Sequence, residues 1–368
     1  VKERFPNEAD NLERFFTEVK QANMLGLLEY FRGIETPRLD PFRHLTVQDC
    51  LDRHFSDPKL KLLLTGDCPH WGAPPERTSF VFDSLLRFSY FLGNYYPVGS
   101  SQAFANALGQ AFMDQGGHLM SQTRMTGLDC AGQVISGVKL EQGKRHKAHK
   151  VKTDKLLYTG DMTGLTQMLP AGSAATERFR EQVAQQRPSL PCFLCHIGIR
   201  GIPQELLQRV HGYHWRDWDP NQAASGNLIF RLFVPTLYDP SLAPEGCDVI
   251  IIQKILDIDY AAVTDWQSHK MAMQKEILSE LERLIPNLSR HMEVCLSATA
   301  WTSYRYTLNV GGSMLGWEAS PDQLGEGRIA QQGPMDNLYF AGHWTRPGGG
   351  ITPVIISAEN AARLIGKG

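Results

Sequence analysis

The sequence lacks an excess of charge of one sign, because its 368 residues carry 37 basic and 39 acidic side chains. Nucleic-acid-binding proteins normally carry a strongly basic surface, so we predict no nucleic-acid partner. The sequence also has no uninterrupted apolar run near the ~20 residues that a bilayer span needs. We therefore expect no transmembrane segment.

The cysteines follow no disulfide framework. There are seven, and an odd, scattered set is typical of reduced thiols in a cytoplasmic protein. Cys192-Phe-Leu-Cys195-His196 matches a c-type haem attachment string, but the surrounding LPCFLCHIGIR is typical of a strand. In a strand, residues three apart point to opposite faces. Since no second Cys or His pair completes a zinc site, we predict no metal site.

Apolar periodicity predicts several long helices. In the first, over 7–31, the expected apolar stripe runs from Leu12 to Phe31 and includes Met24, Leu27 and Leu28. We expect further helices over 80–93, 102–115 and 263–285. Gly116-Gly117 predicts the end of the third, because glycine adopts left-handed dihedrals at low cost.

Short apolar runs between turn-forming residues predict strands. We expect them over 118–125, 133–140, 150–160, 192–200, 227–235, 247–256 and 292–301. A helix followed by a meander of short strands is a local α/β unit.

The C-terminal stretch from Asn337 to Ile365 is the most informative part of the sequence. Leu338–Ala341 predicts a buried parallel strand, and Gly342 allows a sharp exit from it. Pro347 and the glycines at 348, 349 and 350 predict a tight loop without side chains. Thr352-Pro353 then predicts a helix start, with Thr352 as the cap and proline at the first helical position. The expected apolar face of this helix is Val354, Ala358, Ala361, Ala362 and Ile365.

This strand, loop and helix start predict an anion-binding site. Free backbone N–H groups and the positive end of the helix dipole converge where glycine lets a ligand approach. The alternative is an ordinary strand–helix connection whose glycines serve only the turn.

Several motifs resemble one family of flavoproteins. NLYFAGHWTRPGGGITPVIISAENAA (337–362) resembles the C-terminal FAD motif of the phytoene desaturase, carotenoid isomerase and retinol saturase group within the amine-oxidase-like flavoproteins. YYPVGSSQAFANALGQAFMDQGG (95–117) resembles the return from the substrate domain to the FAD domain, and 118–140 resembles the adenine-side strands. AWTSYRYTLNVGGSMLGWE (300–318) resembles the segment before the last FAD motif.

The resemblance implies an α/β fold with an α+β substrate domain. A partial Rossmann-type FAD-binding domain, 97–168 and 326–368, is interleaved with a substrate domain of mixed sheet and helices, 1–96 and 169–325. FAD is the implied cofactor, and no catalytic side chain is nominated. The implied cofactor-binding residues are Met125, Gly342, His343, Gly349, Gly350, Ile351, Thr352 and Val354. The amides of Val354 and Ile355 are expected to face the flavin N1–C2=O region.

Two departures from the family pattern stand out. The family opens with a strand and a GxGxxG loop that hold the ADP pyrophosphate, and nothing here matches it. We expect that this N-terminal segment is missing through truncation, and that the present chain alone binds FAD poorly. His343 follows Gly342 where many flavoproteins carry an acid.

The implied function is an FAD-dependent oxidoreductase that desaturates, saturates or isomerises a lipophilic isoprenoid or polyene by hydride transfer at flavin N5. Its expected partner is a small lipophilic substrate, held in an apolar tunnel lined by 80–96 and 225–256. Such a substrate allows peripheral contact of a cytoplasmic protein with a membrane. The alternatives are a flavin amine oxidase-like enzyme, which would have an aromatic cage, and a truncated, non-catalytic relative.

Overall fold

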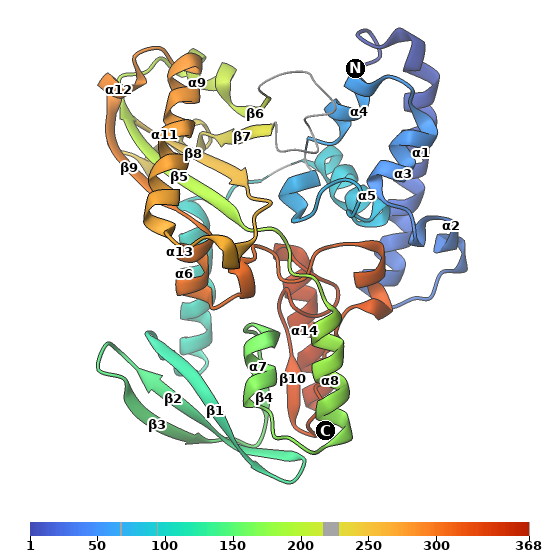
Figure 1. The fold of residues 1–368 in the computed structure, drawn as a ribbon, viewed down its shortest axis with the longest axis vertical. Helices are drawn as coiled ribbons and strands as arrows, with labels where there is room; N and C mark the ends of the chain where they lie inside the picture. Colours follow the sequence, from blue (N-terminus) through green and yellow to red (C-terminus); the bar gives the residue numbers. More distant parts are fainter. Residues whose placement is uncertain (67, 94, 216–227, 368) are drawn as a thin grey trace.

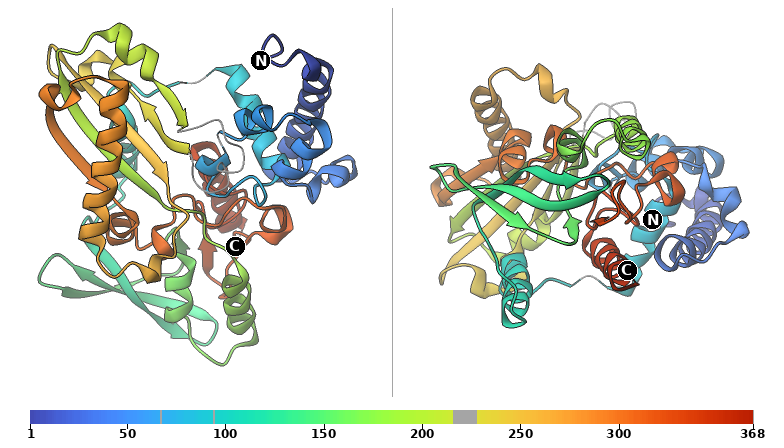
Figure 2. Two further views of the ribbon diagram at one scale, coloured as in Figure 1. Left: turned by 45° about the horizontal axis from the view of Figure 1, so that its top comes forward. Right: turned by 90° about the horizontal axis from the view of Figure 1, so that it is seen from below.

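The computed structural model describes residues 1–66, 68–93, 95–215 and 228–367. Figure 1 shows a layer of N-terminal helices on one side, a larger sheet on the other, and the C-terminal strand and helix beneath them. The N-terminal helices and the larger sheet also lie on opposite sides in the left view of Figure 2. The described residues mix helices with parallel and antiparallel sheets, which confirms the predicted mixed α/β class.

The N-terminal layer is helical. It contains α1 (Ala9–Gly26), the π-helical turn η2 (Leu27–Phe31), α2 (Asp40–Arg43), α3 (Val47–His54), α4 (Pro58–Leu64) and α5 (Phe80–Ser89). Within α1, Leu12, Phe15 and Val19 are buried as predicted, whereas Met24 is 56% exposed. At 100° per residue, Met24 lies roughly 180° around the helix from Phe15, the residue at the centre of the buried stripe. The buried stripe therefore continues through Ala22 and Leu25 instead.

Aromatic rings and one buried ion pair hold this layer together. Phe15 packs against Phe55 and Phe80, with ring centroids 5.3 and 6.0 Å apart. The buried Asp83 accepts hydrogen bonds from Arg87 at 2.9 and 3.0 Å and from the Trp71 indole at 3.3 Å. Asp83 thus ties α5 to the turn that carries Trp71.

A second unit joins the middle of the chain to its C-terminus. Its elements are α6 (Ser100–Asp114), β1 (Thr123–Ala131), β2 (Val134–Gln142), β3 (Lys147–Lys152), β4 (Leu156–Tyr158), α7 (Met162–Met168), α8 (Ala174–Gln185), β10 (Leu338–Phe340) and α14 (Ile351–Lys367). β1, β2 and β3 form an antiparallel sheet. β10 pairs in parallel with β4 and is fully buried, as predicted for 338–341.

Contacts distant in sequence fix this unit. The Asn337 amide binds both the N–H and the carbonyl of Ile135, at 2.9 and 2.7 Å. Phe179 of α8 stacks on Phe340, with ring centroids 5.4 Å apart. Segments 97–168 and 326–367 therefore share a core, to which 169–325 contributes Phe179 and Trp317. The interleaved two-domain division stays a proposal.

Predicted and observed boundaries differ around this unit. α6 ends before Gly116, whose φ is +85°, as predicted. The strand expected over 118–125 begins only at Thr123, and the run over 150–160 divides into β3 and β4. β4 pairs with β10 rather than with the meander, and that change of partner breaks the run.

The third unit is a five-stranded antiparallel sheet. Its order is β6 (Gly212–Trp215), β7 (Leu228–Phe233), β8 (Cys247–Ile255), β5 (Cys192–Arg200) and β9 (Met292–Ala298). The nearby helices are α9 (Gln204–Val210), α11 (Trp266–Leu284), α12 (Leu288–His291) and α13 (Ala300–Thr307). Asn227, the first residue of the strand expected over 227–235, lies outside the described residues.

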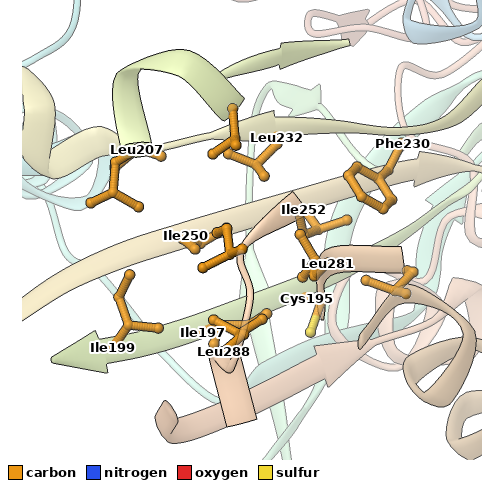
Figure 3. Close-up of a cluster of buried hydrophobic side chains, with 14 of the residues drawn as sticks. Cys195, Ile197, Ile199, Leu207, Phe230, Leu232, Ile250, Ile252, Leu281 and Leu288 are labelled. Atoms are coloured by element: carbon orange, nitrogen blue, oxygen red, sulfur yellow. The ribbon is translucent and has the colours of Figure 1, made fainter. Parts of the chain in front are cut away.

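One face of this sheet forms the largest buried cluster that we describe. Ile197, Ile250, Ile252 and Leu232 point into it and meet Leu281 of α11 (Figure 3). Alternate residues of the same strands, such as Leu194 and Gln253, point to the opposite face because side chains alternate along a strand.

The Cys192–His196 segment lies in β5, and this confirms the predicted strand. Cys192 and Cys195 face opposite sides of the sheet, so their sulfurs diverge. The Cys195 sulfur instead lies 3.4 Å from that of Cys295 on β9. Burial raises the pKa of Cys192 to about 11, which keeps its thiol protonated at neutral pH.

No helix among the described residues combines the length and apolar character needed to cross a membrane.

Candidate functional site

The exit from β10 is joined directly to helix α14. Gly342 has φ +100°, a conformation that favours glycine. Its N–H donates to the Ser357 hydroxyl at 3.1 Å. This hydrogen bond fixes the distance between the strand end and the helix, so the predicted site residues 342–350 lie in one loop that leads into the helix start at 351–354.

The three glycines of the loop are required for two different reasons. Gly348 and Gly350 have φ of +135° and +110°, which strains any side chain. Gly349 does not have positive φ, but a Cβ there would lie 2.7 Å from the Leu315 carbonyl oxygen. Close backbone approach, rather than conformation, thus excludes a side chain at Gly349.

Arg328 supports the loop from inside the protein. Its guanidinium donates to the carbonyls of Gln323, Trp317 and His343 at 3.2, 2.9 and 3.0 Å. A Cβ on Gly348 would lie 3.2 Å from its Cζ. No carboxylate in the described ranges pairs with Arg328, and burial lowers its pKa to about 10. The side chain remains a cation at neutral pH, and its hydrogen bonds hold three backbone carbonyls in place.

His343 is neutral in this setting. Burial, with a smaller contribution from the charge of Arg328, lowers its pKa to about 4. Its ring packs edge-on to Trp344, with centroids 5.1 Å apart. His343 can therefore offer a ligand a hydrogen bond but no positive charge.

The start of α14 corrects the predicted cap. The helix begins at Ile351, and the Val354 N–H donates to the Gly350 carbonyl at 3.1 Å. Thr352 and Pro353 therefore lie inside the first turn, so the prediction of Thr352 as the cap is wrong. A glycine with φ +110° precedes the helix at this point and allows the chain to enter it one residue earlier.

The accessible amides at this helix start are also different from those predicted. The Val354 amide is used within the helix, so it does not face a ligand. The amides of Ile351 and Thr352 form no hydrogen bond with another described residue, and Ile351 is 64% exposed. First-turn amides are normally free to bind anions, so Ile351 and Thr352 are the donors that this site offers.

The buried face of α14 differs in part from the predicted one. Ser357 and Ala361 are buried, whereas Ala358 and Ala362 are exposed. The hydrogen bond from Gly342 turns the hydroxyl of Ser357 inward. A polar contact has thus set the rotation of the helix, which an apolar pattern does not reveal.

Met125 is placed apart from the other predicted residues. It lies in β1 opposite Leu140 and packs, partly buried, on the core that contains Leu338 and Trp344. It belongs to a different sheet from β10. Its assignment to a cofactor site stays a prediction.

A cavity of about 720 Å³ adjoins the exposed face of the five-stranded sheet. Its lining residues are Tyr90, Tyr95, Tyr96, Leu194, His211, Tyr213, Arg231, Phe233, Tyr238, Ile251 and Gln253. Both segments expected to line a tunnel, 80–96 and 225–256, contribute to it; residues 94 and 225–227 lie outside the described residues. The walls are mainly aromatic and aliphatic but also carry hydroxyl, imidazole and guanidinium groups, so the lining is less apolar than the expected tunnel.

The cavity and the glycine loop are connected through one short segment. Gln253, in the cavity wall, donates to the Met314 sulfur at 3.2 Å. The next residue, Leu315, contacts Gly349 and is held by its N–H to the Ser189 hydroxyl at 2.8 Å. Residues 314–315 thus separate the cavity wall from the loop.

Sequence reasoning missed Arg328, Leu315 and Arg231. Nothing in the local pattern marks Arg328 or Leu315, because their roles come from contacts across the fold. Arg231 interrupts the apolar run LIFRLF, and this single charge in a predicted strand was the available signal.

A parallel strand, a glycine loop and a helix with free first-turn amides together define a nucleotide-cofactor-binding protein. Residues 32–366 match the model of the family described as flavin containing amine oxidoreductase, and the chain belongs to this family. The match confirms the predicted flavoprotein family and its FAD cofactor.

Curated relatives are similar over most of this chain. It is 24% identical to a zeta-carotene-forming phytoene desaturase of Myxococcus xanthus, over 92% of this chain and 65% of the relative. It is also 24% identical to prolycopene isomerase 1, chloroplastic, of an Oncidium hybrid cultivar, over 98% of this chain and 64% of the relative. The chain thus spans about two thirds of the length of these relatives.

Solved structures support the fold. Putrescine oxidase superposes with a TM-score of 0.63 at 12% identity, over 98% of this chain and 76% of that protein. Cyclohexylamine oxidase from Brevibacterium oxydans IH-35A gives 0.61 at 14% identity, over 96% and 75%. These likenesses show that the chain has the fold of flavin amine oxidases.

The residues of the loop fit a flavin. Gly350 has only Pro353 within 4 Å of a would-be Cβ, so a ligand can approach its backbone. The exposed amides of Ile351 and Thr352 would hold an electron-rich edge of the cofactor at the positive end of the helix dipole. The fit rests on backbone groups, which explains why few distinctive side chains mark the site.

Proposed function

We propose that this chain forms the larger part of an FAD-dependent oxidoreductase that acts on a lipophilic isoprenoid or polyene. Desaturation, saturation and isomerisation are the reactions that we consider. The curated relatives whose names include phytoene desaturase and prolycopene isomerase support this class.

One observation carries the proposal: a cavity with aromatic walls lies next to the glycine loop. Gln253 of the wall touches Met314, and the adjacent Leu315 touches Gly349. A ligand in the cavity would thus be close to a cofactor held at Ile351 and Thr352. Cofactor enzymes of this kind depend on how the protein positions the two molecules.

The protein's own groups supply position and electrostatics. FAD, when bound, supplies the two-electron redox chemistry. The amides of Ile351 and Thr352 favour negative charge beside them, by ~0.3–1 kcal/mol and up to ~2 kcal/mol when partly buried. Arg328 holds the His343 carbonyl and the loop in place. Rings such as Phe233 and Tyr238, stacked with centroids 5.8 Å apart, would exclude water from the substrate.

A flavin amine oxidase remains the second candidate, because the cavity does have aromatic walls. The positive charge of Arg231 in the cavity wall argues against an amine substrate. An ammonium group beside Arg231 would be repelled, since like charges in a partly buried site are unfavourable. No acidic side chain is among the described lining residues to bind an ammonium.

The test is anaerobic reduction of the flavin in the full-length protein. We expect phytoene in lipid vesicles to bleach the oxidised-flavin absorbance, and putrescine to leave it unchanged. Prolycopene should be isomerised if isomerisation is the reaction. Leu194→Trp, which fills the cavity, should slow the reaction at least about 10-fold, whereas Leu296→Trp on an exposed part of the same sheet should not.

Reduction by putrescine without any response to the polyenes would contradict the proposal. Equal rates in the two tryptophan variants would show that the reaction takes place elsewhere.

A further inference from the structure

A row of side chains crosses four strands beneath the cavity. Tyr213 is paired with Arg231, Arg231 with Gln253, and Gln253 with Leu194. Directly opposite residues on neighbouring strands point to the same face of a sheet. All four side chains line the cavity, so Arg231 stands in its wall between a phenol and an amide.

Arg231 brings a charge to this wall that no described acid neutralises. Its guanidinium carbon lies 5.7 Å from the centre of the Tyr213 ring. In 1–66, 68–93, 95–215 and 228–367 no carboxylate forms an ion pair with it, and the described lining contains no Asp or Glu. A half-buried cation without an acid among the described residues favours an anionic ligand, because an uncompensated charge is costly to remove from water.

Two histidines near Arg231 are neutral. His211 accepts a hydrogen bond at Nδ1 from the Val234 N–H at 3.4 Å, so its proton is on Nε2, which remains a donor. Burial and the charge of Arg231 lower the pKa of His211. The same two causes lower the pKa of His70 to about 3. His70 packs edge-on to Tyr213 at 5.2 Å, and neither of its ring nitrogens has a hydrogen-bond partner among the described residues.

We propose that the cavity binds a molecule with a polyene or other apolar body and one carboxylate head, and that Arg231 binds the head. The inference rests on the proposed function and names the substrate class of the same site. Tyr96, Phe233 and Tyr238, with centroid separations of 5.4 and 5.8 Å, supply a surface for the body.

The charge of the cavity selects among possible ligands. A hydrocarbon polyene can occupy the cavity but leaves the Arg231 guanidinium without a described acidic partner, so it should bind more weakly than a polyene of the same body with a carboxylate head. A diphosphate head would need more positive charge than the single permanent cation in the described lining. A carboxylate matches the planar guanidinium in both charge and geometry.

The experiment compares two probes with the same polyene and different heads, all-trans-retinoate and all-trans-retinol. Affinities are measured by quenching of tryptophan fluorescence in the FAD-loaded full-length protein. We expect retinoate to bind at least about 10-fold more tightly, the change typical of a hydrogen bond to a charged group. Arg231→Gln should abolish the preference and Arg231→Lys should retain part of it.

The matched control is Arg200→Gln. Arg200 lies on β5 of the same sheet, is 56% exposed and pairs with Glu293 at 3.3 Å. This variant should keep the wild-type preference, and circular dichroism with flavin content confirms the folding of each variant. Equal binding of the two probes, or a preference that survives in Arg231→Gln, overturns the inference while leaving the proposed function intact. Binding of neither probe, together with no flavin reduction by polyenes, overturns both.

Discussion

At the scale of single residues, buried charged groups and neutral histidines set the character of the site. Arg328 and Arg231 are both cations without a described acidic partner, but their surroundings differ. Arg328 is fully buried and bonded to three carbonyls, so its role is complete within the fold. Arg231 borders a cavity, so its charge remains available to a ligand.

His343 should make the protein less stable in mild acid. Its folded pKa of about 4 lies below the ordinary histidine value of 6.5. Between these values the unfolded state binds more protons than the folded state, so stability is lost as pH falls from 6.5 towards 4. The contribution is at most about 3.4 kcal/mol. We expect His343→Gln to flatten this part of the pH dependence, as measured by urea unfolding.

His146 provides the control for this prediction. Its side chain is 77% exposed on a turn, so His146→Gln controls for the loss of a histidine from the surface. If His343→Gln loses as much stability between pH 6.5 and 4 as the wild type, His343 is not buried as a neutral group.

At the scale of elements, the N-terminal helices depend on one buried ion pair. Asp83 is fully buried, and Arg87 bridges from it to the Leu64 carbonyl at 2.8 Å. Removal of one partner leaves a charge without compensation, which typically lowers stability by about 3–5 kcal/mol. We expect Asp83→Ala to lower the free energy of unfolding by this amount, as measured by chemical denaturation.

The control for Asp83→Ala is a substitution in an exposed ion pair. Glu293 and Arg200 are 59% and 56% exposed, and surface pairs contribute about 0–1 kcal/mol. Similar losses in Asp83→Ala and Glu293→Ala would show that the α5 ion pair does not anchor the helical layer.

Elements with strong local patterns were predictable from the sequence, whereas their ends and rotations were not. α6, β5 and β10 follow apolar patterns and turn glycines that act within a few residues. The start of α14 was misplaced because Gly350, not Thr352, precedes the helix. Its buried face was partly wrong because Ser357 turns inward to bind Gly342. Such contacts depend on the assembled fold.

The same distinction holds for the site. The glycine loop could be predicted because glycines have few alternative roles in that arrangement. The hydrogen bond from Arg328 to the His343 carbonyl and the contact of Leu315 with Gly349 join residues far apart in sequence. The polarity of the cavity was missed because aromatic density in 80–96 predicted an apolar tunnel, whereas Arg231 on β7 and His211 just before β6 add polar groups to the lining.

At the scale of the whole molecule, the protein places the glycine loop of its C-terminal unit near the wall of a cavity on its five-stranded sheet. Residues 314–315 join them, since Met314 contacts Gln253 and Leu315 contacts Gly349. A change at this junction should therefore act on both sites. A small side chain at Gly349 is the least disruptive way to make that change.

The most direct test of this arrangement is the FAD content of Gly349→Ala in the full-length protein, measured by flavin absorbance after gel filtration. The new methyl group would lie 2.7 Å from the Leu315 oxygen, so the loop must shift and displace the amides of Ile351 and Thr352. We predict that FAD binds at least about 10-fold more weakly, a change of about 1.4 kcal/mol. Gly109→Ala, in α6 with no atom within 4 Å of the added carbon, should retain FAD fully. Full FAD retention by Gly349→Ala would contradict the placement of the cofactor at this loop.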